Sequence, residues 1–248
     1  MHDPHAILPI TAPEAIEARS LAIIDAEVPE PRPFDGPRWD IVRRLIHTTA
    51  DFELLDLVRF SPGAVEAGLA ALAAGATIVT DTEMARCAMP PRRLTPLGCT
   101  VRCLLNDPDV AATATASGGT RAAAAVDAAL ATLAGPLVFA IGNAPTALLR
   151  LLKRLNEGAP APALVIGMPV GFVNAAESKA LLMTHGDVPW ITVSGRKGGS
   201  ALAGATVNAL AILLLERQER KMPPAAGGII PPGPPERGRP REWARAGG

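Results

Sequence analysis

The segment from Arg44 to Asp51 carries three side chains that can move a proton or bind an anion. Arg44, His47 and Asp51 are spaced by three and four residues, so one helix running through all three would place them on the same face. An imidazole, with an ordinary pKa of about 6.5, can donate or accept a proton near neutral pH. Asp51 would orient the ring, and Arg44 would hold an anionic substrate above it. The spacing predicts either a general acid at His47 or a structural histidine held by hydrogen bonds.

Three glycine-rich turns each follow an apolar run and lead into a helical segment. They span residues 142–145, 167–172 and 195–200. Glycine lets the backbone approach a ligand, and a helix N-terminus offers free N–H groups to an anion. In an open parallel sheet all three turns lie at the carboxyl ends of the strands, where ligands bind. We predict that an anionic ligand binds there. The alternative is that the turns are tight connections without a ligand. The expected contacts of such a ligand are Asn143, Arg196 and Ser200.

Two further side chains stand where a ligand can be bound. Arg121 opens an alanine-rich helical segment, although a cation in the first turn opposes the helix dipole. That position is easier to explain if the guanidinium binds a carboxylate or phosphate of a ligand. The alternative is a structural ion pair within the protein. Asp81 ends an apolar run and can accept a hydrogen bond from a substrate N–H or cap the next helix. Glu177 and Lys179 match ordinary surface charges.

The motifs of several common chemistries are missing from the sequence. No turn has the glycine–lysine order of a phosphate-binding loop, and none has the Gly-x-Gly-x-x-Gly dinucleotide pattern. No serine lies in a nucleophile elbow. Cys99 and Cys103 are four residues apart without a neighbouring histidine, so buried thiols fit better than a metal site or a disulfide. We expect neither a metal nor a cofactor.

Composition narrows the class of protein further. The chain has 248 residues with 24 basic and 24 acidic side chains, 48% hydrophobic residues and 3% aromatic residues. The balanced charge and the scarcity of aromatic rings argue against a nucleic-acid partner. The first residues contain no apolar signal segment, which predicts a cytoplasmic enzyme. Glycine, proline or asparagine interrupts the uncharged stretches at 128–149 and 198–215, so buried strands and helices are expected there rather than membrane spans.

Strand and helix signals alternate from residue 76 to residue 215. Expected strands cover residues 76–81, 98–104, 137–141, 163–166 and 190–193, and expected helices cover 13–24, 38–49, 62–74, 120–133, 145–155, 174–182 and 200–215. Apolar strands alternating with helices predict an α/β fold whose mainly parallel sheet is covered on both faces. We expect residues 1–215 to form one domain. Residues 216–248, of which 13 are proline or glycine, are expected to form a disordered tail.

Taken in order, the motifs resemble those of the precorrin-8X methylmutases, also called cobalt-precorrin-8 methylmutases. The resemblance runs from about Ser20 to Asn208 and rests on many short matches. They are Ser20-Leu-Ala-Ile-Ile, Arg44-Leu-Ile-His47, Ala74-Gly-Ala, Asp81-Thr-Glu-Met84, Thr120-Arg121, Ile141-Gly-Asn-Ala-Pro-Thr-Ala147, Ile166-Gly-Met-Pro-Val-Gly-Phe-Val173, Ala176-Glu-Ser-Lys179 and Gly195-Arg-Lys-Gly-Gly-Ser200. The order of so many matches, rather than any single one, identifies the family.

The resemblance implies an isomerase of cobalamin (vitamin B12) biosynthesis. Such an enzyme moves a methyl group from C-11 to C-12 of a corrin precursor, giving hydrogenobyrinic or cobyrinic acid. The family fold is a three-layer α/β/α arrangement, usually in a homodimer with shared sites. The family's catalytic histidine corresponds to His47. Its substrate contacts correspond to Ser20, Arg44, Asp81, Met84 and Arg121.

The chemistry of such a substrate agrees with the residues found. A flat macrocycle edged by carboxylates needs apolar walls and several cationic or N–H anchors. We expect His47 to protonate the macrocycle and ease a 1,5-sigmatropic methyl shift. The imidazole should then face a cavity, lined by the glycine-bearing rim, that is broad enough for a corrin. A corrinoid carrier without activity and a nucleotide- or phosphosugar-binding α/β protein are the alternatives.

Overall fold

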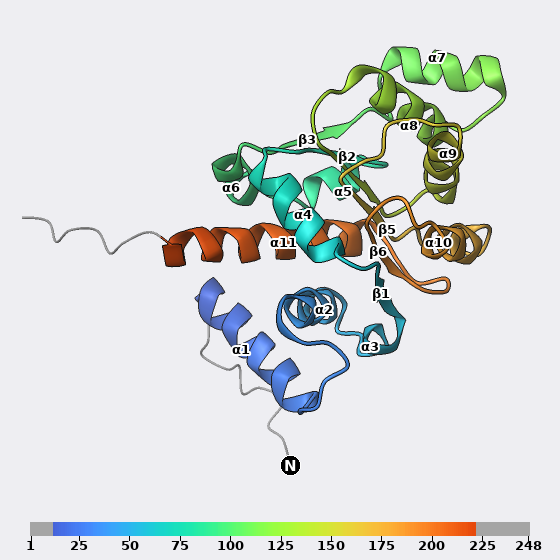
Figure 1. Cartoon of the computed structure of the whole chain (residues 1–248). Coiled ribbons are helices and arrows are strands. Elements are labelled where there is room, and N and C mark those ends of the chain that lie inside the picture. Colours follow the sequence, from blue (N-terminus) through green and yellow to red (C-terminus); the bar gives the residue numbers. More distant parts are fainter. Residues whose placement is uncertain (1–11, 222–248) are drawn as a thin grey trace, which may run out of the picture.

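The computed structural model of the chain describes residues 12–221, in which helices and strands alternate (Figure 1). The helices are α1 (Pro13–Glu27), α2 (Gly36–Thr49), α3 (Leu54–Leu57), α4 (Ala64–Ala73), α5 (Glu83–Cys87), α6 (Pro91–Leu94), the 3-10 turn η1 (Thr95–Leu97), α7 (Pro108–Ser117), α8 (Arg121–Thr132), α9 (Pro145–Asn156), α10 (Ala175–Met183) and α11 (Ser200–Lys221). The strands are β1 (Val58–Phe60), β2 (Thr77–Thr80), β3 (Thr100–Cys103), β4 (Leu137–Ile141), β5 (Leu164–Gly167) and β6 (Trp190–Val193). The predicted alternation from residue 76 onward is confirmed.

The strands form one sheet in the order β1-β6-β5-β4-β2-β3. Neighbouring strands are parallel except β1 and β6, which run antiparallel with Val58 opposite Val193. The chain moves outward from β2 to β3 and then returns to place β4 on the other side of β2. The strand order therefore reverses between β2 and β4, and such reversals are where open sheets bind ligands.

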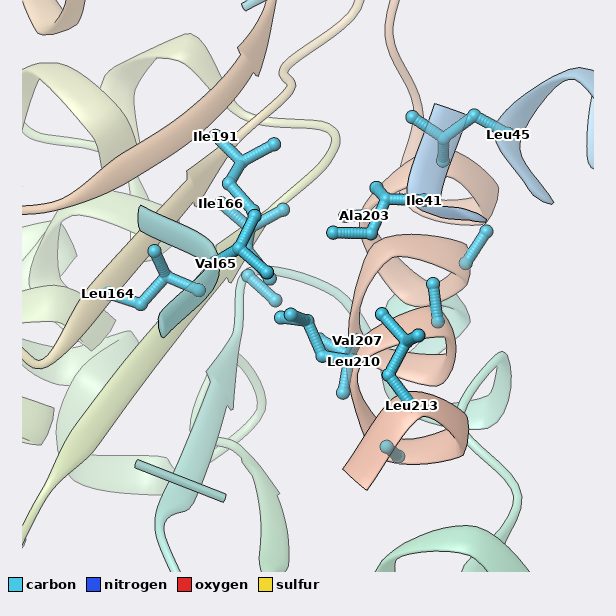
Figure 2. Packing of buried hydrophobic residues seen from close by; sticks show 14 of the residues in the cluster. Ile41, Leu45, Val65, Leu164, Ile166, Ile191, Ala203, Val207, Leu210 and Leu213 are labelled. Atoms are coloured by element: carbon cyan, nitrogen blue, oxygen red, sulfur yellow. The ribbon is translucent and has the colours of Figure 1, made fainter. Parts of the chain in front are cut away.

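Helices cover both faces of the sheet, and alternate residues of each strand enter two separate cores. Ile78 and Val138 belong to the core that includes α2, α4 and α11, whereas Val79 and Phe139 belong to the core that includes α8 and α9. Figure 2 shows the first core, with side chains of α11, α2 and α4 gathered over those of β5 and β6. The predicted three-layer arrangement is confirmed.

Several short elements were not expected from the sequence, β1 and α7 among them. β1 has only three residues between two helices, too few to carry a recognisable alternation. α7 buries only Val110 and Ala114, so it lacks the wide apolar stripe that marks an amphipathic helix.

The long helix α11 is a core helix. Over Ser200–Arg220 it is long and apolar enough to cross a membrane, but 72% of its most apolar window is buried inside the fold, and it contacts α2 and α4. It continues six residues past the predicted end at 215, with an ion pair between Glu216 and Arg220 on its last turns. The predicted disordered tail lies, from residue 222 onward, outside the described residues.

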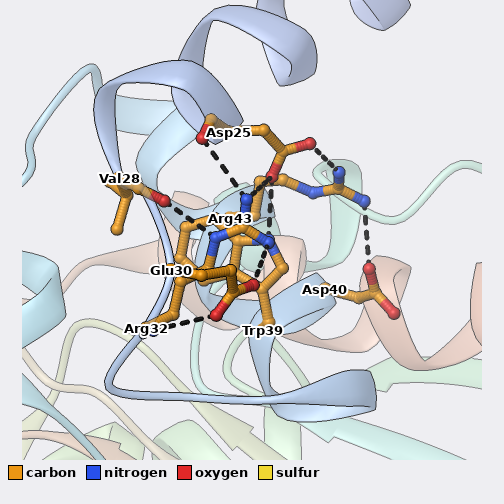
Figure 3. A network of polar contacts seen from close by, with 7 residues as sticks. All are labelled: Asp25, Val28, Glu30, Arg32, Trp39, Asp40 and Arg43. Carbon is orange, nitrogen blue, oxygen red and sulfur yellow. Dashed lines mark hydrogen bonds and ion pairs between the residues drawn. The ribbon is translucent and has the colours of Figure 1, made fainter.

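A polar network fixes the connection between α1 and α2 (Figure 3). The Asp25 carboxylate of α1 accepts hydrogen bonds from Trp39 Nε1 at 2.9 Å and from Arg43 Nη1 at 2.6 Å, both on α2. Arg32, in the connecting loop, donates to Val28 O at 2.8 Å and lies 4.7 Å from the centre of the Trp39 ring. Because these contacts join both helices and their loop, they hold α1 against α2.

Candidate active site

His47 lies on the last turn of α2 and faces α1. Its Nδ1 is 2.8 Å from the Oγ of Ser20, 27 residues earlier in the chain. A hydroxyl can accept from a protonated Nδ1 or donate to a bare one, so this bond persists in both protonation states of the ring. It orients the imidazole and leaves Nε2 without a hydrogen-bond partner among residues 12–221. Two predicted site residues are thus brought together.

The role expected for Asp51 is wrong. α2 ends at Thr49, and Ala50 adopts a left-handed conformation with a φ of 54°, so the face that carries His47 does not continue to Asp51. Asp51 instead pairs with Lys197, with 2.5 Å between Oδ2 and Nζ. The Ser20 hydroxyl, rather than a carboxylate, therefore orients the imidazole.

Arg44 lies one helical turn before His47 and binds Glu17 of α1. Their ion pair measures 2.6 Å, and the Arg44 side chain is only 13% exposed. The hydrogen bond from Arg44 holds the pKa of the Glu17 carboxyl below its usual value. Because Glu17 and Ser20 are also one turn apart, the two helices are joined by two successive polar contacts. A substrate carboxylate that reaches Arg44 would compete with Glu17.

The pocket beside His47 is small within a single chain. It holds about 180 Å³ and is lined by α1, α2 and the turn that follows α2, with Ser20, Ile23, Glu27, His47 and Phe52 among its residues. Ligand pockets usually measure roughly 300–1,000 Å³. The pocket that residues 12–221 form beside His47 is therefore smaller than the broad cavity expected there, and α1 lies over the face of α2 that carries the imidazole.

Asp81 follows β2 and is 4% exposed. Its carboxylate accepts hydrogen bonds from the N–H groups of Gly142 at 3.0 Å, Asn143 at 2.7 Å and Ala144 at 2.6 Å. In this turn the predicted N–H donors bind an internal carboxylate rather than a ligand anion. Burial raises the pKa of Asp81, although the three N–H groups act in the opposite direction. The carboxylate fixes the turn after β4 at the reversal of strand order.

Ser200 begins α11 and is buried beside Thr82. Their hydroxyl oxygens are 2.9 Å apart. Thr82 also caps α5 by accepting from Ala85 N at 3.1 Å, a role that the sequence left open for Asp81. A Cβ atom on Gly142 would lie 2.6 Å from Ser200 Cα, so the turn after β4 packs backbone to backbone against α11. Asp81 and Ser200 are thus brought to one place in the rim.

The two later glycine turns interlock. Gly171 N donates to Arg196 O at 3.1 Å, and Gly199 N donates to Met168 O at 2.9 Å. A Cβ atom on Gly198 would lie 2.2 Å from Met168 O, so only glycine fits there.

Lys197 links this rim to the N-terminal helices. Its Nζ is 2.5 Å from Asp51 and 2.8 Å from Glu53, both just beyond the end of α2. His47 is four residues before Asp51 in the sequence. The imidazole and the rim therefore lie at the same end of the molecule.

Four other predicted contacts lie at this edge of the sheet, all of them exposed. Met84 of α5 is 72% exposed. Arg121 is placed by the hydrogen bond between its neighbour Thr120 and α9, and its Nη1 is 3.4 Å from Asn106 Oδ1. Within residues 12–221, Arg121 makes no ion pair, and no side-chain hydrogen bond joins it, Met84, Asn143 or Arg196 to His47.

Two residues of the rim region were missed or misread in the sequence. Phe172 is 84% exposed in the turn after β5, beneath the Arg196 guanidinium at 5.5 Å, and an aromatic side chain inside a glycine-rich turn was the available signal. Lys179 was expected at the surface but is fully buried. Ala175, Lys179 and Leu182 are buried at helical spacing on α10, which was the signal for that position.

Among residues 12–221, no group of three or more His, Cys, Asp or Glu side chains is arranged to hold a metal ion. Cys99 is buried and its thiol contacts Leu72 O at 3.3 Å, as expected for a packed thiol. The described residues therefore offer a histidine held by a hydroxyl and a rim of interlocked backbone turns.

The fold and the site together place the chain in the class of three-layer α/β proteins. Its pair of N-terminal helices positions a histidine beside the carboxyl edge of the sheet. A family model described as precorrin-8X methylmutase matches residues 15–213. This chain belongs to the precorrin-8X methylmutase family.

Individual relatives agree with this assignment. The chain is 52% identical over 169 residues to the precorrin-8X methylmutase of Pseudomonas aeruginosa, covering 68% of this chain and 80% of that protein. It is 46% identical to the cobalt-precorrin-8 methylmutase of Salmonella typhimurium, covering 84% and 98%. A solved structure of the precorrin-8X methylmutase from Thermus thermophilus has a TM-score of 0.76 and 49% identity, covering 82% and 97%.

The family assignment makes the protein an isomerase that moves a methyl group within one molecule. The predicted methylmutase function is confirmed at this level. Neither the carrier nor the nucleotide-binding alternative is favoured.

Proposed function

We propose that the substrate of this chain is a corrin precursor, precorrin-8X or its cobalt form, and that the methyl group moves from C-11 to C-12 of ring C. The contact between Ser20 and His47 carries the proposal, because it presents an oriented imidazole whose second nitrogen is free to act on a ligand. The methyl migration involves no redox change and no hydrolysis, so the protein needs to supply only proton transfer.

His47 acts as the general acid. The imidazolium donates a proton to the macrocycle. The C-11–methyl bond then breaks as the C-12–methyl bond forms in a 1,5-sigmatropic shift. Finally the proton returns to the imidazole. Substrate and product then contain the same atoms. The proton given up and regained is the one on Nε2, so Nδ1 keeps its hydrogen and donates it to the Ser20 hydroxyl throughout. General acid catalysis of this kind contributes about 10²–10⁴-fold.

The carboxylates of the macrocycle bind along the carboxyl edge of the sheet. Arg121 and Arg196 supply exposed guanidinium groups, which suit planar carboxylates, and Asn143 supplies an exposed amide. Met84 and Phe172 supply apolar surface for the faces of the ring. Arg44 reaches a carboxylate by exchanging Glu17 for it. Asp81 and Ser200 act by shaping the rim that the substrate contacts.

A second copy of the chain completes the site. The pocket at His47 in one chain holds only about 180 Å³, and the rim exposes large apolar side chains. Phe172 is 84% exposed, Val173 is 77% exposed and Val170 is 43% exposed. Covering these side chains with another chain would bury apolar area and deepen the pocket, which supports a homodimer with shared sites. We place the reaction in the cytoplasm, because the polycarboxylate substrate is strongly charged, and we assign no membrane or nucleic-acid partner.

The experiment replaces His47 with Ala and follows the absorbance of precorrin-8X and of its cobalt form during conversion. We expect turnover to fall about 10²–10⁴-fold while the melting temperature is retained. Thr48→Ala, on the same helix and exposed, serves as the control and keeps full turnover. A fully active His47→Ala enzyme removes His47 from the mechanism, and a wild-type chain that binds both corrinoids without converting either overturns the proposal. Sedimentation of the wild-type chain tests the dimer.

A further inference from the structure

Lys179 is a buried charge that the reaction scheme does not use. It lies on α10 with no exposed surface, whereas Glu177, two residues earlier, is exposed. Its Nζ donates a hydrogen bond to the main-chain oxygen of Lys197 in the turn after β6. Among residues 12–221 no carboxylate forms an ion pair with it, and burial lowers the pKa of the ammonium to about 8. Burying an ammonium without a counter-charge costs stability, which points to a role other than stability.

The residue that Lys179 binds is the one that joins the rim to α2. While the main-chain oxygen of Lys197 accepts from Lys179, its side chain reaches 2.5 Å from Asp51 and 2.8 Å from Glu53. The next residue, Gly198, lies so close to Met168 O that even a Cβ atom would not fit. The main chain at 197–198 is therefore held on two sides, and its position sets where the Lys197 side chain meets the end of α2.

We propose that Lys179 is a positioning residue, which fixes the main chain of Lys197 and through it the placement of the glycine-bearing rim relative to the helix that carries His47. The inference rests on the proposed function, in which His47 must meet a substrate held by that rim. A misplacement of about 1 Å in such an arrangement can cost about 10²-fold in rate.

The test compares Lys179→Met, which removes the ammonium and keeps a long side chain, with Glu177→Gln as a control on the same helix. We expect Lys179→Met to lower kcat by about tenfold or more, while its melting temperature is unchanged or higher because a buried charge has been removed. Amide hydrogen exchange should accelerate at residues 194–199 and 47–53 and not in α8 or α9. Lys179→Arg, which keeps a charged donor, should recover part of the lost turnover. Glu177→Gln should leave both turnover and exchange unchanged.

A double-mutant cycle that combines Lys179→Met with Lys197→Met tests whether Lys179 acts through Lys197. If Lys179 acts through Lys197, the double variant loses little more kcat than the more damaging single variant. Wild-type turnover in Lys179→Met, or a loss that follows a lower melting temperature without local exchange, would overturn the inference. The outcome is separable from the fate of the proposed function. If His47→Ala is active, His47 is not the general acid, and hydrogen exchange in Lys179→Met still tests whether Lys179 positions the rim. If His47→Ala is inactive and Lys179→Met is fully active, only the positioning role of Lys179 is rejected.

Discussion

The Oγ of Ser20 and the Nδ1 of His47, 2.8 Å apart, join two helices across a connection that is itself pinned by Asp25. One turn earlier on each helix, Glu17 and Arg44 make a second contact of 2.6 Å. The imidazole is thus oriented by a neighbouring helix rather than by its own. Its environment depends on how α1 lies on α2.

Replacing Ser20 with Ala should lower kcat about fivefold, because one hydrogen bond contributes about 1 kcal/mol and a factor of ten in rate corresponds to about 1.4 kcal/mol. The ring then loses its fixed orientation but remains a competent acid. Steady-state kinetics with either corrinoid substrate measures the effect. Ser20→Thr keeps the hydroxyl and should keep most of the activity. Equal activity of Ser20→Ala and wild type would show that the hydroxyl does not orient the catalytic form of His47.

Replacing Asp81 with Asn should loosen the turn after β4. The two carboxylate oxygens accept three N–H groups, and an amide would turn an –NH₂ group toward at least one of them. A buried donor without an acceptor costs about 1–3 kcal/mol. We expect a melting temperature lower by several degrees, measured by calorimetry, together with a loss of turnover. Asp187→Asn, at an exposed position, is the matched control. An unchanged melting temperature would contradict the role given to the carboxylate.

Acidification should weaken the contact between α1 and α2. The pKa of the Glu17 carboxyl lies below its ordinary value, chiefly because Arg44 donates a hydrogen bond to it. A carboxyl with a lowered pKa in the folded state stabilises the fold above its unfolded pKa, and the contribution disappears as pH falls through the folded value. Urea unfolding from about pH 5 downward should therefore show a steeper loss of stability for the wild type than for Glu17→Gln. Parallel curves for the two proteins would exclude a contribution from this ion pair.

Much of the fold follows from local patterns that the sequence makes explicit. The run Leu137–Ile141 is apolar at every position and is buried at every position, as a strand covered on both faces must be. The glycine turns mark the carboxyl edge, and Gly142 and Gly198 stand where no side chain fits. By contrast, three residues of β1 carry no pattern of their own, and their pairing with β6 depends on a strand 130 residues later.

The candidate site divides in the same way. His47 as the candidate acid, the shared edge of the glycine turns and the ordered methylmutase motifs could all be predicted from the sequence, because they depend on residue type and short spacing. The folded structure was needed to show that Ser20 rather than Asp51 orients the imidazole, since one left-handed residue at Ala50 turns the chain away. The same holds for the contacts of Asp81 with backbone N–H groups and for the burial of Lys179 against Lys197. Such contacts join residues far apart in sequence, and their geometry is set by packing rather than by local periodicity.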